Sequence, residues 1–150
     1  MLQTTHVYLF NNKGQLLLWM KKRWFGMGNW NGFGGKNHQW ETIKETALRE
    51  LSEESWIFLE EDQIEKVGIL HFFYVANPNR NQDVHIFTWV YDANFEETEE
   101  MKPQWRDIKD IPYESMREDD HIWLPKLINK ETPFDMTFTF NEEGKLSEYF

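Results

Sequence analysis

Five stretches of the chain place hydrophobic side chains at the continuous or alternating spacing of β-strands: residues 4–10, 15–20, 66–76, 84–91 and 136–140. They are rich in β-branched and aromatic residues, which pleated surfaces favour. The polar run at residues 11–14 separates the first two stretches and predicts a hairpin. A second polar turn at residues 77–81 joins the third and fourth stretches, and residues 104–106 favour a further short strand.

Two other segments carry hydrophobic side chains at helical spacing. Residues 41–55 predict a helix, because no Gly or Pro interrupts them and four apolar side chains recur every three or four positions: Ile43, Ala47, Leu48 and Leu51. Residues 121–129 predict a second helix, capped by Asp119 and Asp120, provided that Pro125 lies in its first turn. Residues 24–35 hold five of the eight glycines and predict a loop.

The composition indicates a folded protein without a membrane segment. Apolar residues make up 40% of the chain and aromatic residues 17%, which argues against disorder. No stretch approaches the roughly 18 apolar residues of a membrane span, and the first residues do not resemble a secretory leader. The absence of cysteine excludes disulfides and thiolate chemistry. We expect one cytoplasmic domain spanning residues 1–150, a monomer that binds no membrane.

Charge is divided unevenly along the chain. Residues 1–40 hold five basic side chains and no acidic one, whereas residues 41–150 hold 11 basic and 26 acidic side chains. The overall charge of −10 disfavours binding to a nucleic-acid polymer, because phosphate contacts dominate that affinity. Two interpretations remain open: a surface kept acidic for solubility, or metal-assisted chemistry on a phosphorylated small molecule.

Known phosphate-binding loops do not account for the glycines. A P-loop ending at Gly35 would need a glycine at Trp30, and a dinucleotide fingerprint starting at Gly26 would need one at Asn31. The sequence has no Gly-x-Ser-x-Gly motif, and its five histidines lack the spacing of zinc proteases. These classes are excluded.

Three carboxylates converge on one face of the first predicted helix. Glu50, Glu53 and Glu54 occupy positions i, i+3 and i+4, so they repel one another, and Arg49 offsets only part of that repulsion. Binding of Mg²⁺ or Mn²⁺ would remove it, because hard cations prefer oxygen ligands and substrate phosphates. An ordinary solvated acidic stripe is the alternative.

The spacing around this helix resembles the Nudix box, G-x5-E-x7-R-E-U-x-E-E-x-G-U. The matching residues are Gly35, Glu41, Arg49-Glu50-Leu51, Glu53-Glu54 and Ile57. Trp56 departs from the box, which has glycine there, and Trp40 also replaces a family glycine. Because tryptophan would be strained in a left-handed helix cap, we expect the end of this helix to be remodelled. Segments throughout the chain also resemble the MutT-type oxidised purine nucleoside triphosphate diphosphatases, among them residues 20–23, 29–36, 83–85, 100–105, 119–123 and 134–140.

Together with the predicted strands, the resemblance implies a fold and an activity. The fold would be α/β (α+β), a mixed β-sheet sandwiched between helices (α/β/α). The activity would be Mg²⁺-dependent hydrolysis of a nucleoside triphosphate such as 8-oxo-dGTP to the monophosphate and pyrophosphate, with Mn²⁺ as a substitute metal, for sanitation of the nucleotide pool. The alternatives are a Nudix hydrolase for 2-hydroxy-dATP or another nucleoside diphosphate derivative, and a catalytically silent nucleotide-binding domain.

Carried over position by position, the resemblance implies a metal site. Its ligands would be the carbonyl of Gly34 and four carboxylates: Glu50, Glu53, Glu54 and Glu100. The catalytic group would comprise Glu53, Glu54, Arg49 and Glu100, with Arg49 orienting a box carboxylate. Glu41 would stabilise the junction between loop and helix. Glu100 has an alternative reading as part of a solvated acidic loop.

The resemblance also implies a substrate site. Its residues would be Lys21 at the phosphates and, at the base, Phe25, Asn31, Phe72, Arg117, Asp119 and Asp120. In an apolar pocket the two adjacent aspartates would repel, which raises the pKa of one and lets it donate a hydrogen bond; merely capping the next helix is their alternative role. Phe25 and Phe72 have the alternative of being core. Arg117 stands where the family has a stacking tryptophan, and a guanidinium can also stack on a purine.

Overall fold

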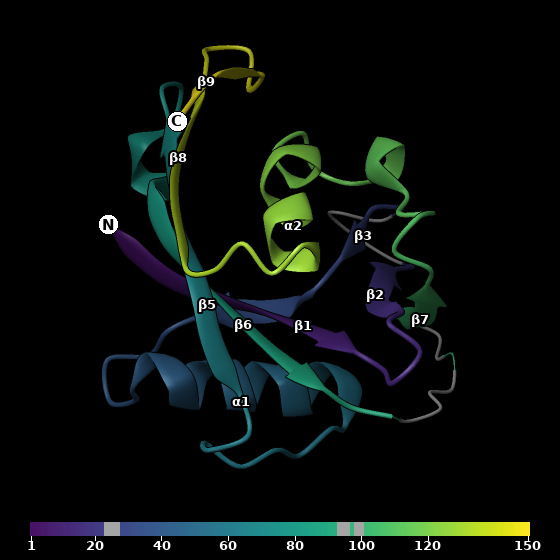
Figure 1. The fold of residues 1–150 in the computed structure, drawn as a ribbon. Coiled ribbons are helices and arrows are strands. Elements are labelled where there is room, and N and C mark those ends of the chain that lie inside the picture. The colour runs from purple at the N-terminus through teal and green to yellow at the C-terminus, as the bar shows by residue number, and fades with distance from the viewer. Residues whose placement is uncertain (23–27, 93–96, 98–100) are drawn as a thin grey trace.

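The computed structural model describes residues 1–22, 28–92, 97 and 101–150, with Lys21 as backbone only (Figure 1). The strands in this part of the chain are β1 (Leu2–Phe10), β2 (Leu16–Lys21), β3 (Trp30–Asn31), β4 (Phe33–Lys36), β5 (Glu65–Tyr74), β6 (Gln82–Val90), β7 (Met101–Arg106), β8 (Phe134–Phe140) and β9 (Leu146–Tyr149). Its α-helices are α1 (Ile43–Ser55) and α2 (Asp120–Ile128), and short 3₁₀ turns occur at Pro78–Arg80 and Tyr113–Ser115.

The strands of the described residues join into one mixed sheet. Its order is β3-β2-β1-β6-β5-β8-β9, with β4 paired to β1 and β7 paired to β2. β1 runs parallel to β6 and β5 runs parallel to β8, whereas β5 and β6 are antiparallel. Figure 1 shows α1 on one side of this sheet and α2 on the other. The predicted mixed sheet between helices is therefore confirmed.

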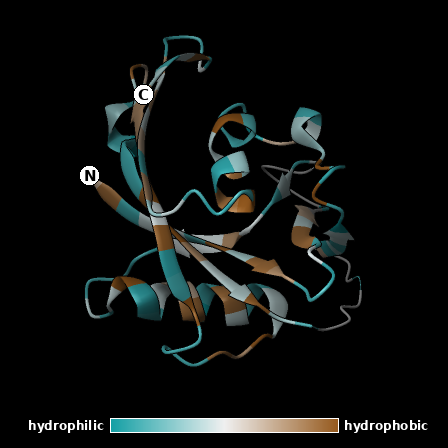
Figure 2. Ribbon diagram, in the orientation of Figure 1, coloured by the Kyte–Doolittle hydropathy of each residue, from teal (hydrophilic) through white to brown (hydrophobic). Residues whose placement is uncertain are grey.

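The alternation of side chains along β1 explains the two helical layers. Val7 and Leu9 point into the core that α1 covers with Ala47, whereas Tyr8 points into the core that α2 covers with Trp123. Figure 2 shows hydrophobic and hydrophilic positions interleaved along the strands and along both helices. Each helix thus covers one face of the sheet with its apolar stripe.

One strand, β3, lies inside residues 24–35, the segment predicted as a loop, and β4 begins there and ends one residue beyond it; one further strand was not predicted. Both β3 and β4 begin within this glycine-rich run, which lacks a hydrophobic pattern. A Cβ on Gly34 would lie 1.7 Å from the carbonyl oxygen of Thr5, so β4 pairs with β1 only because this side chain is missing. β9 is mostly exposed, so its sequence carries no buried alternation.

The helix α1 begins at Ile43, two residues later than predicted. Thr42 caps it, since its hydroxyl accepts from the Glu45 N–H at 3.1 Å and the Glu45 carboxylate accepts from the Thr42 N–H at 2.9 Å. At the other end Trp56 adopts the left-handed conformation with φ of 61°, and its N–H donates to the Ser52 carbonyl at 2.9 Å. The expected remodelling of this end is wrong, because the left-handed cap persists with tryptophan in it.

The helix α2 begins at Asp120 and contains Pro125 beyond its first turn, contrary to the expectation from sequence. Pro125 lacks the N–H that would bond to the His121 carbonyl, and the helix ends soon afterwards at Ile128. Within the described residues, no helix is long and apolar enough to cross a membrane.

Candidate functional site

The strand β4 presents bare backbone to the carboxylates of α1. Gly34 pairs with His6 and Gly35 with Thr5 on β1, which holds β4 in place. A Cβ on Gly35 would lie 2.4 Å from the carboxyl carbon of Glu50, so this carboxylate occupies the space that a side chain would fill. Glycine at this position therefore allows Glu50 to reach the strand.

The carboxylate of Glu54 is fixed on the same strand by a backbone donor. The Gly34 N–H donates to Glu54 Oε1 at 2.7 Å. Glu50 and Glu54 thus lie beside consecutive residues of β4, one against Gly35 and the other against Gly34. The third box carboxylate, Glu53, has a side chain that is 57% exposed and accessible to solvent.

Arg49 links the carboxylates of the box to one another. Its Nη1 donates to Glu50 at 2.9 Å and to Glu53 at 3.3 Å. Its Nη2 and Nε donate to the two oxygens of Glu41 at 2.8 and 3.0 Å, a bidentate pair. These hydrogen bonds from Arg49 lower the pKa of Glu41 to about 2. One guanidinium therefore offsets the repulsion among the glutamates and ties α1 to the segment before it.

Glu41 also joins the loop to the helix. Its Oε1 accepts from the His38 N–H at 3.0 Å and from the Thr46 hydroxyl at 2.8 Å. Arg49 in turn donates to the carbonyl of Lys36 at 3.0 Å. One network of hydrogen bonds around Glu41 and Arg49 thus joins the end of β4 to the start of α1.

The chemistry of these donors suits a hard divalent cation. Carboxylate oxygens are the ligands that Mg²⁺ prefers, and the glycines leave room for close approach. The hydroxyl of Thr5 is fully buried and lacks a hydrogen-bond partner, and its pairing with Gly35 places it on the same side of the sheet as Glu50. Among the described residues, however, no three His, Asp or Glu side chains converge closely enough to hold a metal ion by themselves. Glu50 and Glu54 instead turn oxygens toward Arg49 and the Gly34 N–H.

A second group of predicted residues surrounds a small cavity of about 30 Å³ on the α2 side of the sheet. Five of the predicted residues line it: Asn31, Phe72, Arg117, Asp119 and Asp120. His6, Tyr8 and Gln82 also line it and were not predicted. His6 and Tyr8 follow from the alternation of β1, which would have placed both on the face that α2 covers.

The paired aspartates face the indole of Trp123 rather than the helix end. Trp123 Nε1 donates to both carboxylates, at 3.0 Å to Asp119 Oδ2 and 3.0 Å to Asp120 Oδ1. Neither side chain caps a backbone N–H of α2, so their alternative role as helix caps is wrong. Burial and the neighbouring Asp119 raise the pKa of Asp120 to about 8. Asp120 therefore keeps its proton at neutral pH and can donate a hydrogen bond.

Arg117 forms part of the wall of this cavity. Its guanidinium carbon lies 4.7 Å from the centroid of the Phe72 ring, and its Nη2 donates to the Tyr74 hydroxyl at 2.8 Å. Its Nε donates to Asp119 at 3.1 Å. Burial acts to lower the pKa of Arg117, but Asp119 and Tyr74 outweigh it and the pKa is raised. Arg117 thus stacks on a protein ring and neutralises Asp119.

His6 lies between the small cavity and Gly34 of β4. Its ring lines the cavity, and its Cδ2 lies 2.6 Å from where a Cβ on Gly34 would be. Burial lowers the pKa of His6 to about 4, with a further contribution from Arg117, so the ring is neutral at pH 7. Phe25, Glu100 and the side chain of Lys21 lie outside the described residues.

Comparisons with known proteins give a consistent result. The NUDIX domain family matches residues 2–133. The chain is 44% identical over 119 residues to the oxidized purine nucleoside triphosphate hydrolase of Danio rerio, covering 79% of this chain and 74% of that protein. It is 43% identical over 136 residues to the Mus musculus protein of the same name, covering 90% and 85%. The structure of a mutator MutT protein from Bacillus halodurans superimposes with a TM-score of 0.80 at 23% identity, covering 100% of this chain and 97% of that one, which shows a shared fold.

Proposed function

The chain belongs to the NUDIX family, and on that premise we propose that it hydrolyses oxidised purine nucleoside triphosphates to the monophosphate and pyrophosphate. The leading substrate is 8-oxo-dGTP, with 2-hydroxy-dATP as the alternative. The observation that carries the proposal is the alignment of two helix carboxylates along a bare glycine strand, Glu50 against Gly35 and Glu54 against Gly34. The names of the two animal relatives support the substrate class.

The cofactor of the proposed reaction is a divalent cation, with Mg²⁺ as the expected ion. Glu50, Glu53 and Glu54, with the Gly34 carbonyl, would hold it. When bound, the cation supplies charge neutralisation for the triphosphate and lowers the pKa of a coordinated water. The protein's own part is orientation: Arg49 holds Glu50 and Glu53 on one side of α1, and the Gly34 N–H holds Glu54. The exposed carboxylate of Glu53 is accessible to water and would accept its proton.

In the proposed site, a hydrogen-bond acceptor and a hydrogen-bond donor of the protein lie side by side to recognise the purine base. Asp119, paired with Arg117, is an acceptor, while Asp120, which keeps its proton to about pH 8, is a donor. The amide of Asn31 offers both functions. Lys21 and Glu100 remain proposed contacts to phosphate and metal, and Phe25 remains a proposed contact to the base. The cavity of about 30 Å³ must widen to admit a purine.

The decisive experiment is pyrophosphate release from dGTP, 8-oxo-dGTP, dATP and 2-hydroxy-dATP in the presence of Mg²⁺. We expect release from the oxidised nucleotides at a higher kcat/KM than from their normal counterparts, and no release after chelation with EDTA. Absence of release from every nucleotide would overturn the enzymatic proposal. Equal rates on dGTP and 8-oxo-dGTP would leave a Nudix hydrolase without the sanitation role.

Replacing Glu54 by glutamine tests the placement of the carboxylates. Because Gln cannot supply a charged oxygen to the cation, we expect Glu54→Gln to lower kcat by about 100-fold or more. The matched control is Glu143→Gln, an exposed glutamate far from the box in sequence, which should keep wild-type turnover. Circular dichroism should show both variants folded. Wild-type turnover by Glu54→Gln would contradict the proposed site.

A further inference from the structure

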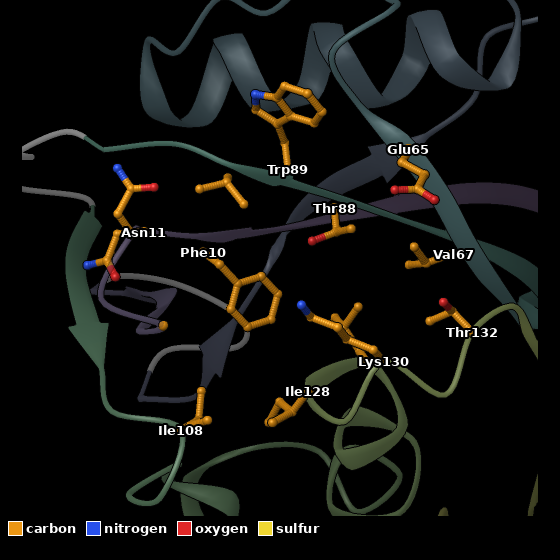
Figure 3. Close-up of a pocket in the computed structure, with 14 residues that line it drawn as sticks. Phe10, Asn11, Glu65, Val67, Thr88, Trp89, Ile108, Ile128, Lys130 and Thr132 are labelled. Atoms are coloured by element: carbon orange, nitrogen blue, oxygen red, sulfur yellow. The ribbon is translucent and has the colours of Figure 1, made fainter.

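A second cavity, of about 710 Å³, lies on the α2 side of the sheet. The ends of β1 and β6, the start of β5 and the C-terminal end of α2 enclose it (Figure 3). The small cavity lies at the opposite end of α2, around Asp119 and Asp120, and the two share no lining residue. A volume of about 710 Å³ falls within the range of small-molecule sites, roughly 300 to 1,000 Å³.

The body of this cavity is apolar and partly open to solvent. Its apolar lining residues come from five different segments: Phe10, Val67, Val90, Ile108, and Leu127 with Ile128. Val90 is 54% exposed and Ile108 is 40% exposed, although both border the hollow. Figure 3 shows the ring of Phe10 beside the hollow and the ring of Trp89 directed away from it, toward α1. A ligand with an apolar ring would remove the exposed surface from water.

Three of the four uncharged polar side chains around the cavity are already engaged within the protein. Asn11 Nδ2 donates to Gln15 at 2.9 Å, the Asn12 amide donates to Asp92, and the Thr88 hydroxyl donates to the Tyr8 carbonyl at 2.8 Å. These three lining residues therefore have reduced capacity for a ligand. Within the described residues, the two charged lining residues, Glu65 and Lys130, are not engaged in this way.

Two opposite charges border the cavity without pairing. In the part of the chain that the structure describes, Glu65 and Lys130 form no salt bridge with each other or with other residues. Lys130 has a left-handed backbone with φ of 58°, and its N–H donates to the Leu127 carbonyl at 3.1 Å, which fixes it just beyond α2. Figure 3 shows its side-chain nitrogen directed into the hollow, with Glu65 above it on β5.

From this arrangement we propose that the cavity binds a small zwitterion with an aromatic body. The carboxylate of the ligand pairs with Lys130, its ammonium group pairs with Glu65, and its ring packs on Phe10 and the aliphatic side chains. A phosphorylated ligand fits poorly, because Lys130 is the one cationic side chain among the described lining residues and the protein carries a net charge of −10. The site is separate from the proposed hydrolytic reaction and does not depend on it.

Three probes with the same indole ring test this charge pattern: L-tryptophan, tryptamine, which lacks the carboxylate, and indole-3-propionate, which lacks the ammonium group. Isothermal titration calorimetry should give the lowest Kd for tryptophan. Lys130→Met should raise the Kd of tryptophan about tenfold and leave that of tryptamine unchanged. Glu65→Gln should raise the Kd of tryptophan by a similar factor and leave that of indole-3-propionate unchanged.

Matched variants distinguish this site from general surface binding. Lys145→Met and Glu143→Gln, both exposed elsewhere, should leave every Kd unchanged. Ile108→Trp, a change at an exposed rim position, should weaken all three probes by filling the cavity. Pyrophosphate release should be the same in Lys130→Met as in wild type. Absence of saturable tryptophan binding at millimolar concentration, or tryptamine binding as tightly as tryptophan, would overturn the proposal.

Discussion

Arg117 is the single residue whose surroundings most change the interpretation of the candidate base pocket. From sequence, its guanidinium was a candidate to stack on the purine. In the structure it already stacks on Phe72 and pairs with Asp119 and Tyr74. The purine would therefore meet an acceptor whose charge is already balanced, next to Asp120 as a donor. We propose that Arg117 acts on base selection through the two aspartates.

Removing this guanidinium should shift the pH dependence of substrate binding. In the wild type we expect KM to rise above about pH 8, where Asp120 loses the proton that it donates to the base. Burial and Asp119 raise the pKa of Asp120, whereas Arg117 lowers it. In Arg117→Met the rise in KM should therefore move to a higher pH.

The measurement is KM for 8-oxo-dGTP between pH 6 and 10 with saturating Mg²⁺. Arg106→Met is the matched control, because Arg106 lies outside the lining of the small cavity and should keep the wild-type profile. A profile that is unchanged, or shifted to lower pH, in Arg117→Met would contradict this role.

At the scale of elements, α1 combines an effective start with a strained end. Its start has the reciprocal capping bonds of Thr42 and Glu45. Its end holds Trp56 in the left-handed region, where an L side chain costs about 1 to 2 kcal/mol relative to glycine. The indole is 81% exposed, so little packing offsets that cost.

Replacing Trp56 by glycine should consequently stabilise the protein. We expect Trp56→Gly to raise the free energy of unfolding by about 1 kcal/mol and Tm by about 2 to 4 °C. Differential scanning calorimetry gives the measurement. Trp40→Gly is the control, because Trp40 is similarly exposed at 83% but does not have a positive φ. An equal gain in both variants would mean that exposure, and not backbone strain, is responsible.

At the scale of the whole molecule, a chain of hydrogen bonds crosses the sheet on the α1 side. Lys66 Nζ lies 2.7 Å from His85 Nδ1, and His85 Nε2 lies 2.7 Å from Gln3 Oε1. Gln3 in turn donates to Asp83 at 2.9 Å, and Asp83 lies 2.6 Å from His71 Nδ1. Residues from β1, β5 and β6 are joined in this way, and His85 must be neutral to accept from Lys66.

Protonation of His85 should therefore weaken the fold. Burial, and then the charge of Lys66, lowers the pKa of His85 to about 4, against 6.5 in an unfolded chain. The unfolded state binds more protons between these values, so stability is lost as pH falls from about 6.5 toward 4. For one group the slope reaches about 1.4 kcal/mol per pH unit. His6 acts in the same direction and Asp120 in the opposite one.

Urea unfolding at pH 6.5, 5.5 and 4.5 isolates the contribution of His85. His85→Gln keeps a neutral acceptor and donor but no titrating group, so its stability should fall less steeply with decreasing pH than that of the wild type. Since His6 and Asp120 are present in both proteins, their effects cancel in the comparison. His121→Gln, at an exposed position of α2, should keep the wild-type slope. Parallel slopes for wild type and His85→Gln would disprove the contribution.

The sequence by itself determined most strands, both helices and the positions of Glu50, Glu53 and Glu54 on one helix face, although their carboxylates do not gather into a cluster in the described structure. These features depend on spacing within one element, and side-chain periods of two or 3.6 residues are visible in one dimension. It also identified Asp119 and Asp120 as a pair, although not their shared contact with Trp123. The spacing within the box similarly predicted that Arg49 lies beside the carboxylates of Glu50 and Glu53.

Only the tertiary structure decided which elements meet. The pairing of β4 with β1 brings Gly34 and Gly35 against α1, and no sequence period predicts a four-residue strand of which half is glycine. The stacking of Arg117 on Phe72 joins residues 45 positions apart. Which groups this guanidinium contacts depends on all the side chains that the fold places around it. Contacts of this kind arise from packing two faces of one sheet, so their geometry belongs to the whole chain rather than to any segment of it.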